Sequence, residues 1–164
     1  MNETPSGHQD PILRHWQDAV PNDRLAHLIR DAGRSLGHRL TPLLAEHDIP
    51  FGHWAFLRVL RDRDGLTQKE LSDAVGVTEP TTFAAVKALL DKGYITRRHN
   101  PGNKRKFYVY LTPEGAALRD VLVPLAEEVN RIAVQDIPPE NIVLMRETLL
   151  RMIENLAEKE TEEP

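Results

Sequence analysis

Residues Leu66 to Thr112 read LTQKELSDAVGVTEPTTFAAVKALLDKGYITRRHNPGNKRKFYVYLT. Hydroxyl residues that can cap a helix stand before two short helical segments, and a glycine follows each segment. Two alternating segments rich in β-branched and aromatic residues then flank a basic turn. This order predicts a winged helix-turn-helix within a mainly α-helical (α+β) chain with a small β-wing. Because that architecture places its second helix in the major groove of duplex DNA, the sequence indicates a DNA-binding module.

The two helices of this stretch are marked at their ends. Thr67 and Glu70 form a capping-box pattern, so we expect the first helix to begin just after Thr67. Gly76 can adopt the left-handed conformation that closes a helix C-terminus. Thr78 can cap the second helix, whose first turn tolerates Pro80 because its missing amide hydrogen is not needed there.

The second helix is expected to run to about Lys92, with Gly93 ending it. From Tyr94 the pattern becomes extended, and residues 100–103 have the composition of a turn. Beyond the turn, side chains alternate as in a half-buried strand, with Phe107, Val109 and Leu111 on one face and Tyr108 and Tyr110 on the other. The two extended segments therefore predict the hairpin that forms the wing.

Positive charge gathers in this module, although the chain as a whole is acidic. Residues 65–111 hold eight lysines and arginines against four acidic residues, an excess of +4, while the whole chain carries −4. The remainder of the chain therefore carries −8. A phosphate-binding face requires such a distribution. The alternative is a winged helix with a protein-interaction or constitutive architectural role, in which residues 97–106 are a solvated charge run.

The same residues resemble the multiple antibiotic resistance regulator (MarR) family of bacterial transcription factors. The matching motifs are Leu66-Thr67-Gln68 with Glu70-Leu71, Pro80-Thr81, Gly93 before Arg97-Arg98, and the wing from Pro101 to Thr112. A looser likeness extends over about residues 23–156. The resemblance implies a DNA-binding transcriptional repressor that binds an inverted-repeat, palindromic operator as a homodimer. Activation is an alternative, because the sign of regulation depends on where the operator lies.

The resemblance also implies which residues contact DNA. They lie at the start of the first helix, along the second helix and in the wing: Thr67, Gln68, Thr78, Pro80, Thr81, Thr82, Phe83, Lys87, Arg98, Asn103, Lys104, Arg105 and Lys106. The family's wing usually carries Asp-x-Arg, which here reads Asn103-Lys104-Arg105. Arg105 keeps the minor-groove role, while Asn103 can orient it only through a neutral hydrogen bond.

Two positions of the recognition helix depart from the family pattern. Phe83 and Ala84 stand where the family often has Thr and Arg, so the usual bidentate contact to guanine is missing. An exposed Phe83 would suit a thymine methyl group. Alternatively, Phe83 packs in the core beside Val86 and Leu90, which share its helical spacing.

Long amphipathic helices are expected on both sides of the winged helix. Apolar residues between Arg24 and Leu44 follow three- and four-residue spacing, with Pro42 near the end of the helix. After the wing, Thr112-Pro113 opens a helix that Pro124 should kink, and a last helix follows Pro138-Pro139. Because these apolar stripes exceed what a winged helix can cover, we expect homodimerisation through both ends of the chain.

The expected organisation has five parts. They are an N-terminal arm at 1–22 with a short helix near 12–19, dimerisation and linker helices at 23–62, the winged helix-turn-helix at 63–112, C-terminal dimerisation helices at 113–157, and an acidic tail at 158–164. Gly33 and Gly37 indicate a close helix crossing at the dimer interface, with a ligand recess as the alternative.

The resemblance further implies an effector, a small anionic aromatic molecule such as a hydroxybenzoate, cinnamate or hydroxynicotinate. The candidate ligand residues precede the module: Ser35, His38, Arg39, His53, Trp54 and Arg58. Trp54 and Arg58 would lie one turn apart, where a ring and a cation can take an aromatic carboxylate. Arg39 lies beside the apolar stripe, where an unpaired guanidinium needs a partner. Ordinary core and boundary packing is the alternative for His53 and Trp54.

The residues that other classes of function require are absent from the sequence. The sequence has no phosphate-binding glycine loop, no serine elbow and no cysteine, so we expect no enzyme, no disulfide and no thiol-based sensor. A metal-sensing regulator is an alternative, but His38, His47 and His53 form no close ligand pair. No apolar run reaches the roughly 18 residues of a membrane span, and the N-terminus lacks a signal-peptide pattern. A cytoplasmic protein with no cofactor and no membrane partner is expected.

Overall fold

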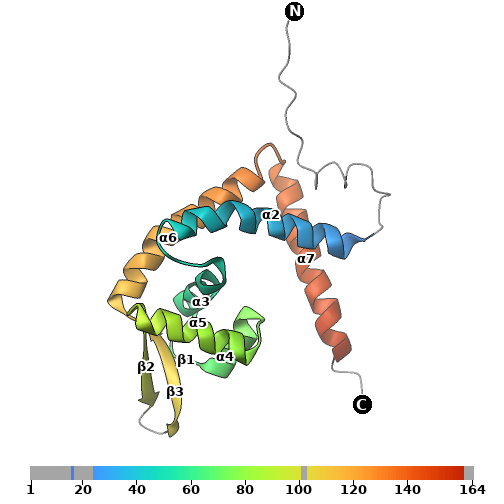
Figure 1. The fold of residues 1–164 in the computed structure, drawn as a ribbon. Coiled ribbons are helices and arrows are strands. Elements are labelled where there is room, and N and C mark those ends of the chain that lie inside the picture. The colour runs from blue at the N-terminus through green and yellow to red at the C-terminus, as the bar shows by residue number, and fades with distance from the viewer. Residues whose placement is uncertain (1–15, 17–23, 101–102, 161–164) are drawn as a thin grey trace, which may run out of the picture. The chain divides into compact units, whose positions relative to one another are not determined.

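The computed structural model describes Trp16 and residues 24–100 and 103–160 (Figure 1). Its elements are α2 (Leu25–Ala45), α3 (Phe51–Asp62), β1 (Leu66–Thr67), α4 (Gln68–Val75), α5 (Glu79–Asp91), β2 (Ile95–Asn100), β3 (Asn103–Leu111), α6 (Pro113–Ala133) and α7 (Pro139–Glu160). The mainly helical fold with a small β-wing is therefore confirmed. The chain divides into two compact units, residues 1–126 and 127–164. Apart from Trp16, the short helix predicted near 12–19 lies outside the described residues.

The sheet has three antiparallel strands in the order β1-β3-β2. The β2–β3 hairpin is the predicted wing, with Ile95 opposite Leu111 and His99 opposite Phe107. Strand β1, which the sequence did not predict, pairs Leu66 with Val109 and ties the start of α4 to the base of the wing. A strand of two residues is too short to show an alternating pattern.

The core of the first unit lies where α3 packs against α2, α4, α5 and β3. Each of these elements contributes buried apolar side chains, among them Leu44, Leu57, Leu71, Val86 and Val109, which are at most 1% exposed. Burying one such side chain stabilises a fold by about 1.5–3 kcal/mol. This shared core therefore holds α4, α5 and the base of the wing in one arrangement.

The helix ends follow the predicted signals. The Thr67 hydroxyl accepts a hydrogen bond from the Glu70 amide, and the Glu70 carboxylate accepts one from the Thr67 amide, which confirms the capping box. Gly76 and Gly93 both have a φ of 74°, in the left-handed region that favours glycine. Thr112 caps α6 by accepting a hydrogen bond from the Gly115 amide at 3.0 Å.

One expectation about packing was wrong. Phe107 was predicted to share the buried face of its strand with Val109, yet its side chain is 52% exposed. Phe107 lies further along the wing, where its ring stacks on His99 at a centroid distance of 4.0 Å. The ring of Phe51 lies beside Gly37 in the same chain, where a Cβ at Gly37 would be 3.5 Å from it, an ordinary van der Waals contact.

The flanking helices carry many exposed apolar side chains. In α2, which continues through Pro42 to Ala45, they are Leu25, Leu28, Ile29 and Leu36. In α7, they are Val143, Leu144, Met145, Leu150, Ile153 and Leu156. Helix α6 continues through Pro124 to Ala133.

Candidate nucleic-acid interface

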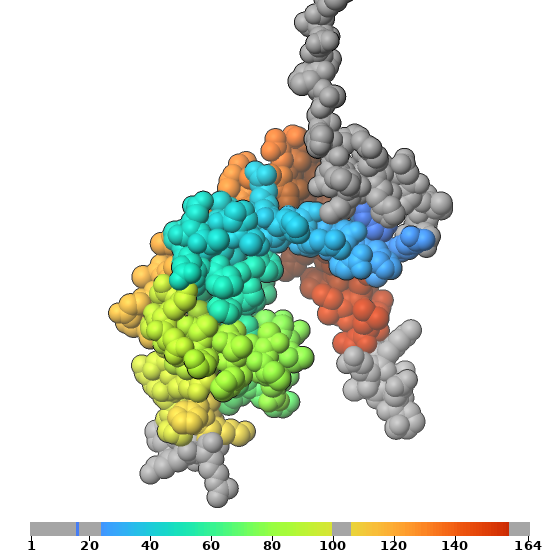
Figure 2. All heavy atoms as spheres, in the orientation of Figure 1, coloured from blue at the N-terminus to red at the C-terminus, as the bar shows by residue number. Residues whose placement is uncertain are grey.

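Packing fixes which face of α5 is exposed. Thr82, Ala85, Val86 and Leu89 are buried, whereas Pro80, Thr81, Phe83, Ala84 and Lys87 are exposed. Figure 2 shows α4, α5 and the wing meeting in one continuous surface in the lower part of the view. The exposed side of the second helix therefore lies beside the wing, as a DNA-reading surface requires.

Thr82 has a different role from the predicted one. Its side chain is 0% exposed, so it cannot contact DNA as the sequence analysis expected. The Thr82 hydroxyl accepts a hydrogen bond from the Ser72 hydroxyl at 2.8 Å and donates one to the Thr78 carbonyl at 3.2 Å. This buried pair joins α4 to α5 and holds α5 at one rotation about its axis.

That rotation decides between the two interpretations of Phe83. The Phe83 side chain is 53% exposed, while Val86, one turn away, is fully buried. Core packing of Phe83 is therefore excluded in this structure, and its ring lies on the exposed face of α5.

The N-terminus of α5 is capped and open to solvent. The Thr78 hydroxyl accepts a hydrogen bond from the Thr81 amide at 3.4 Å and lies 2.9 Å from the Thr81 hydroxyl. Thr78, Pro80 and Thr81 are all exposed. A helix N-terminus carries partial positive charge, so this end of α5 favours a phosphate group.

The start of α4 is engaged in intrachain bonds. Hydrogen bonds from the Thr67 hydroxyl and amide, at 2.7 Å each, hold the pKa of the Glu70 carboxyl below its usual 4.5. The Gln68 amide oxygen accepts a hydrogen bond from the Arg97 guanidinium at 3.4 Å. Thr67 and Gln68 are half-buried, and these bonds link α4 to the base of β2.

The wing presents basic side chains. Arg98 is exposed, and its guanidinium lies 5.3 Å from the centre of the Tyr110 ring, where a cation is attracted to the aromatic face. Lys106 is also exposed. The side chains of Asn103, Lys104 and Arg105, although predicted to contact DNA, lie outside the described part of the structure.

Part of the positive charge in the module is already paired. Lys87 forms a salt bridge with Asp91 at 3.0 Å, and Lys69 forms one with Asp73 at 3.9 Å. These pairs are exposed and contribute little stability, so phosphate can compete for Lys87.

The predicted effector residues differ in their burial. Ser35, His38 and Arg39 are exposed on α2, and Arg58 is exposed on α3. Because Arg39 is exposed, it does not need the partner that burial would demand. Trp54 is 7% exposed and belongs to the core, as its alternative interpretation proposed.

His53 lies at a junction between three segments. Its Nδ1 is buried and, within the described residues, has no hydrogen-bond partner. Burial, followed by the charge of Lys92, lowers the pKa of His53 below its ordinary 6.5. Lys92, just after α5, donates hydrogen bonds to the backbone oxygen of Asp48 at 2.6 Å and to its carboxylate. The contact ties the α2–α3 connection to the end of the recognition helix, and the sequence analysis missed it.

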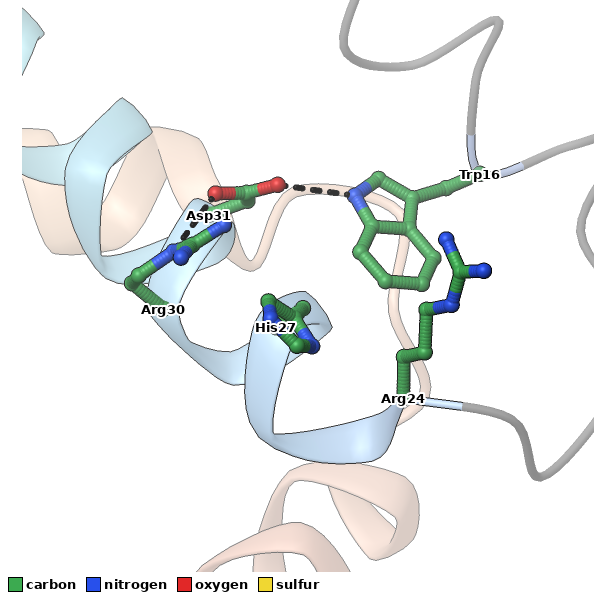
Figure 3. Close-up of a pocket in the computed structure, with 5 residues that line it drawn as sticks. All are labelled: Trp16, Arg24, His27, Arg30 and Asp31. Atoms are coloured by element: carbon green, nitrogen blue, oxygen red, sulfur yellow. Dashed lines mark hydrogen bonds and ion pairs between the residues drawn. The ribbon is translucent and has the colours of Figure 1, made fainter.

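A cavity of about 330 Å³ lies at the start of α2, lined by Trp16, Arg24, His27, Arg30 and Asp31 (Figure 3). The Asp31 carboxylate accepts hydrogen bonds from the Trp16 indole at 3.1 Å and from Arg34 at 2.9 Å. Although burial alone would raise it, these bonds and the nearby arginines lower the pKa of Asp31 below 3.8. None of the predicted effector residues lines this cavity.

The described residues lack two features that other functions would need. Among them, no three His, Asp or Glu side chains are grouped so that they could hold a metal ion. None of the helices there has both the length and the apolar character that a membrane crossing demands.

Comparisons with known proteins agree with this geometry. Residues 47–106 match the family model described as MarR family. The transcriptional regulator HosA of Escherichia coli O111:H- is 26% identical over 102 residues, covering 57% of this chain and 76% of HosA. A MarR transcriptional regulator from Methanosarcina mazei Go1 has a TM-score of 0.77 at 24% identity, over 89% of this chain and 98% of that one. Bordetella bronchiseptica BpsR, whose DNA binding is regulated by 6-hydroxynicotinic acid, has a TM-score of 0.72 at 22% identity, over 82% and 96%.

Proposed function

We propose that this chain is a DNA-binding transcriptional regulator of the MarR family that acts as a homodimeric repressor. In this proposal, two copies bind an inverted-repeat operator, and a small anionic aromatic molecule releases them. Occupation of the operator would then block transcription of the neighbouring genes.

One observation carries the proposal, namely the continuous exposed face that runs from α5 to the wing. Pro80 and Thr81 stand at the positive end of α5, and Lys87 follows along the same helix. Arg98 and Lys106 extend the basic surface onto the wing. Helix α5 would enter the major groove while the wing follows the phosphate backbone.

Support for the homodimer comes from the exposed apolar side chains of α2 and α7. Leu144, Ile153 and Leu156 are 62%, 64% and 68% exposed in the single chain. Large apolar patches of this kind mark sites of association in soluble proteins. A two-fold dimer presents two copies of α5 and therefore predicts an operator with two-fold symmetry.

The effector proposal has two sources of support. BpsR, which shares the fold, is regulated by 6-hydroxynicotinic acid. The buried Nδ1 of His53, to which none of the described residues is hydrogen-bonded, lies beside the contact that ties α2–α3 to α5. A ligand that bonds this nitrogen in only one arrangement of the chain would shift the position of α5.

The experiment measures binding of the full-length chain to labelled DNA from upstream of its own gene, by fluorescence anisotropy. Specific binding should need two chains per operator, and Arg98→Ala should weaken it at least fivefold. Arg61→Ala removes the same charge from α3, outside α5, the wing and the proposed dimer helices, and should leave binding unchanged. Absence of any preferred DNA, or equal losses in the two variants, would contradict the proposal.

The effector is tested separately with 6-hydroxynicotinate, 4-hydroxybenzoate and cinnamate. A true effector should raise the melting temperature with increasing concentration and should also weaken operator binding. His53→Gln should reduce both effects while leaving operator binding intact. Equal responses in the wild type and the variant would remove His53 from the effector site.

A further inference from the structure

The centre of the exposed face of α5 is apolar. Phe83 is 53% exposed and Ala84 beside it is exposed, while Thr82 and Ala85 on either side are buried. Together with the buried Val86 and Leu89, the Ser72–Thr82 hydrogen bond holds α5 at the rotation that leaves its phenyl ring exposed. A large apolar group is therefore held at the middle of the surface proposed to enter the major groove.

The polar side chains around this centre are already bonded within the chain. The Thr81 hydroxyl lies 2.9 Å from that of Thr78, and Lys87 pairs with Asp91 at 3.0 Å. Glu79, at the start of the helix, can only accept hydrogen bonds. Arg, Lys, Asn and Gln are the side chains that bond guanine or adenine in a bidentate manner. Residues 79–91 include no Arg, Asn or Gln, and their one lysine, Lys87, pairs with Asp91.

We propose that Phe83 reads a thymine in each operator half-site by packing against its C5-methyl group. The proposal rests on the repressor function above and names the base that this helix recognises. Among the base edges in the major groove, thymine presents the methyl group that an apolar ring can cover, whereas guanine and adenine present polar atoms there. Placing Phe83 against those polar atoms would remove their water without replacing its hydrogen bonds.

The charge around Phe83 favours DNA over a protein as the occupant. Arg98 and Lys106 are exposed on the neighbouring wing, and the positive end of α5 is one turn away. A positively charged rim around one apolar ring complements a groove whose edges are phosphates and whose floor carries methyl groups.

The test replaces single thymines in the operator by deoxyuridine, which removes the methyl group and keeps base pairing. Binding of the full-length chain to each substituted operator is measured by anisotropy. At one symmetric position, deoxyuridine should weaken wild-type binding about fourfold per half-site, the effect of losing one buried methyl group. Phe83→Ala should bind the thymine and deoxyuridine operators equally.

Phe107→Ala is the matched control, because Phe107 is an exposed phenylalanine of nearly equal exposure, at 52%, on the wing. This variant should keep the full preference for thymine. Phe83→Leu retains an apolar side chain and should keep part of the preference, which guards against a folding defect in the alanine variant.

Specific binding by the wild type with no loss at any deoxyuridine position would overturn the inference while leaving the repressor proposal intact. An equal thymine preference in Phe83→Ala would overturn it as well. Absence of specific DNA binding by the wild type would instead contradict the proposed function. A change in oligomeric state on Phe83→Ala, without a change in base preference, would assign the ring to a protein contact.

Discussion

Substitution of Thr82 by valine tests whether this residue positions the recognition helix or contacts DNA. The valine side chain keeps the shape of threonine and removes only the hydroxyl group. In the structure that hydroxyl is 0% exposed, accepts from Ser72 at 2.8 Å and donates to the Thr78 carbonyl at 3.2 Å. Thr82→Val therefore breaks a buried hydrogen-bonded link between α4 and α5.

The expected loss of stability follows from these bonds. A buried hydrogen bond contributes about 1 kcal/mol, and leaving its partner unsatisfied adds to that loss. Ser72 retains an alternative acceptor, because its hydroxyl also lies 3.0 Å from the Gln68 carbonyl oxygen. We therefore expect the free energy of unfolding to fall by about 1–2 kcal/mol, with the melting temperature lower by about 2–8 °C.

The assay compares urea unfolding followed by circular dichroism with operator affinity measured under conditions in which the variant is folded. Thr82→Val should change operator affinity by less than about twofold, since the side chain is inaccessible to DNA and the buried Val86 and Leu89 still hold the rotation of α5. Thr81→Val is the matched control, because it removes an exposed hydroxyl from the preceding residue. It should change stability by less than about 0.5 kcal/mol and affect mainly DNA binding. A tenfold loss of operator affinity in Thr82→Val with unchanged stability would refute the argument.

Three further predictions follow from individual contacts. Gly115→Ala should destabilise the fold by about 2 kcal/mol or more in urea unfolding, because the new Cβ would overlap the Tyr94 carbonyl oxygen. Gly52→Ala is the control and should not destabilise the fold, because a Cβ at Gly52 would meet open space. Equal losses of stability in the two variants would argue against this packing. Burial lowers the pKa of His53 below 6.5, so the contribution of its neutral ring to stability is present above pH 6.5 and is lost as the pH falls from that value toward the folded-state pKa. The free energy of unfolding measured across this range should show the loss. The same pH profile in His53→Gln would contradict this prediction. Ile153→Asp, at a side chain 64% exposed in the single chain, should convert the dimer to monomer in sedimentation equilibrium, and an intact dimer would place the interface elsewhere.

The sequence predicted the local features of the module well because each depends on neighbouring residues. The capping box at Thr67 and the left-handed glycines at 76 and 93 have nearby causes, and the structure confirms them. Helical spacing alone left Phe83 undecided, since Val86 shares its stripe. The rotation of α5 depends on Ser72, in another helix, so neither the burial of Thr82 nor the exposure of Phe83 follows from the pattern.

The burial of the predicted effector residues could not be derived from the sequence. Helical spacing predicts Trp54 and Arg58 on one face of a helix, but in the structure Trp54 is buried in the core and Arg58 is exposed. The contact of Lys92 with Asp48 joins residues 44 positions apart, and no periodic pattern signals it. Such sites depend on how helices pack, which a single sequence does not specify.

The salt dependence of operator binding tests the central claim that α5 and the wing bind duplex DNA. The logarithm of the binding constant, measured by anisotropy from about 50 to 200 mM salt, should fall steeply and linearly with the logarithm of the salt concentration. For a homodimer, Arg98→Ala should make this slope shallower by about two, because each dimer loses two phosphate contacts. A slope near zero, or a slope that Arg98→Ala leaves unchanged, would contradict the account.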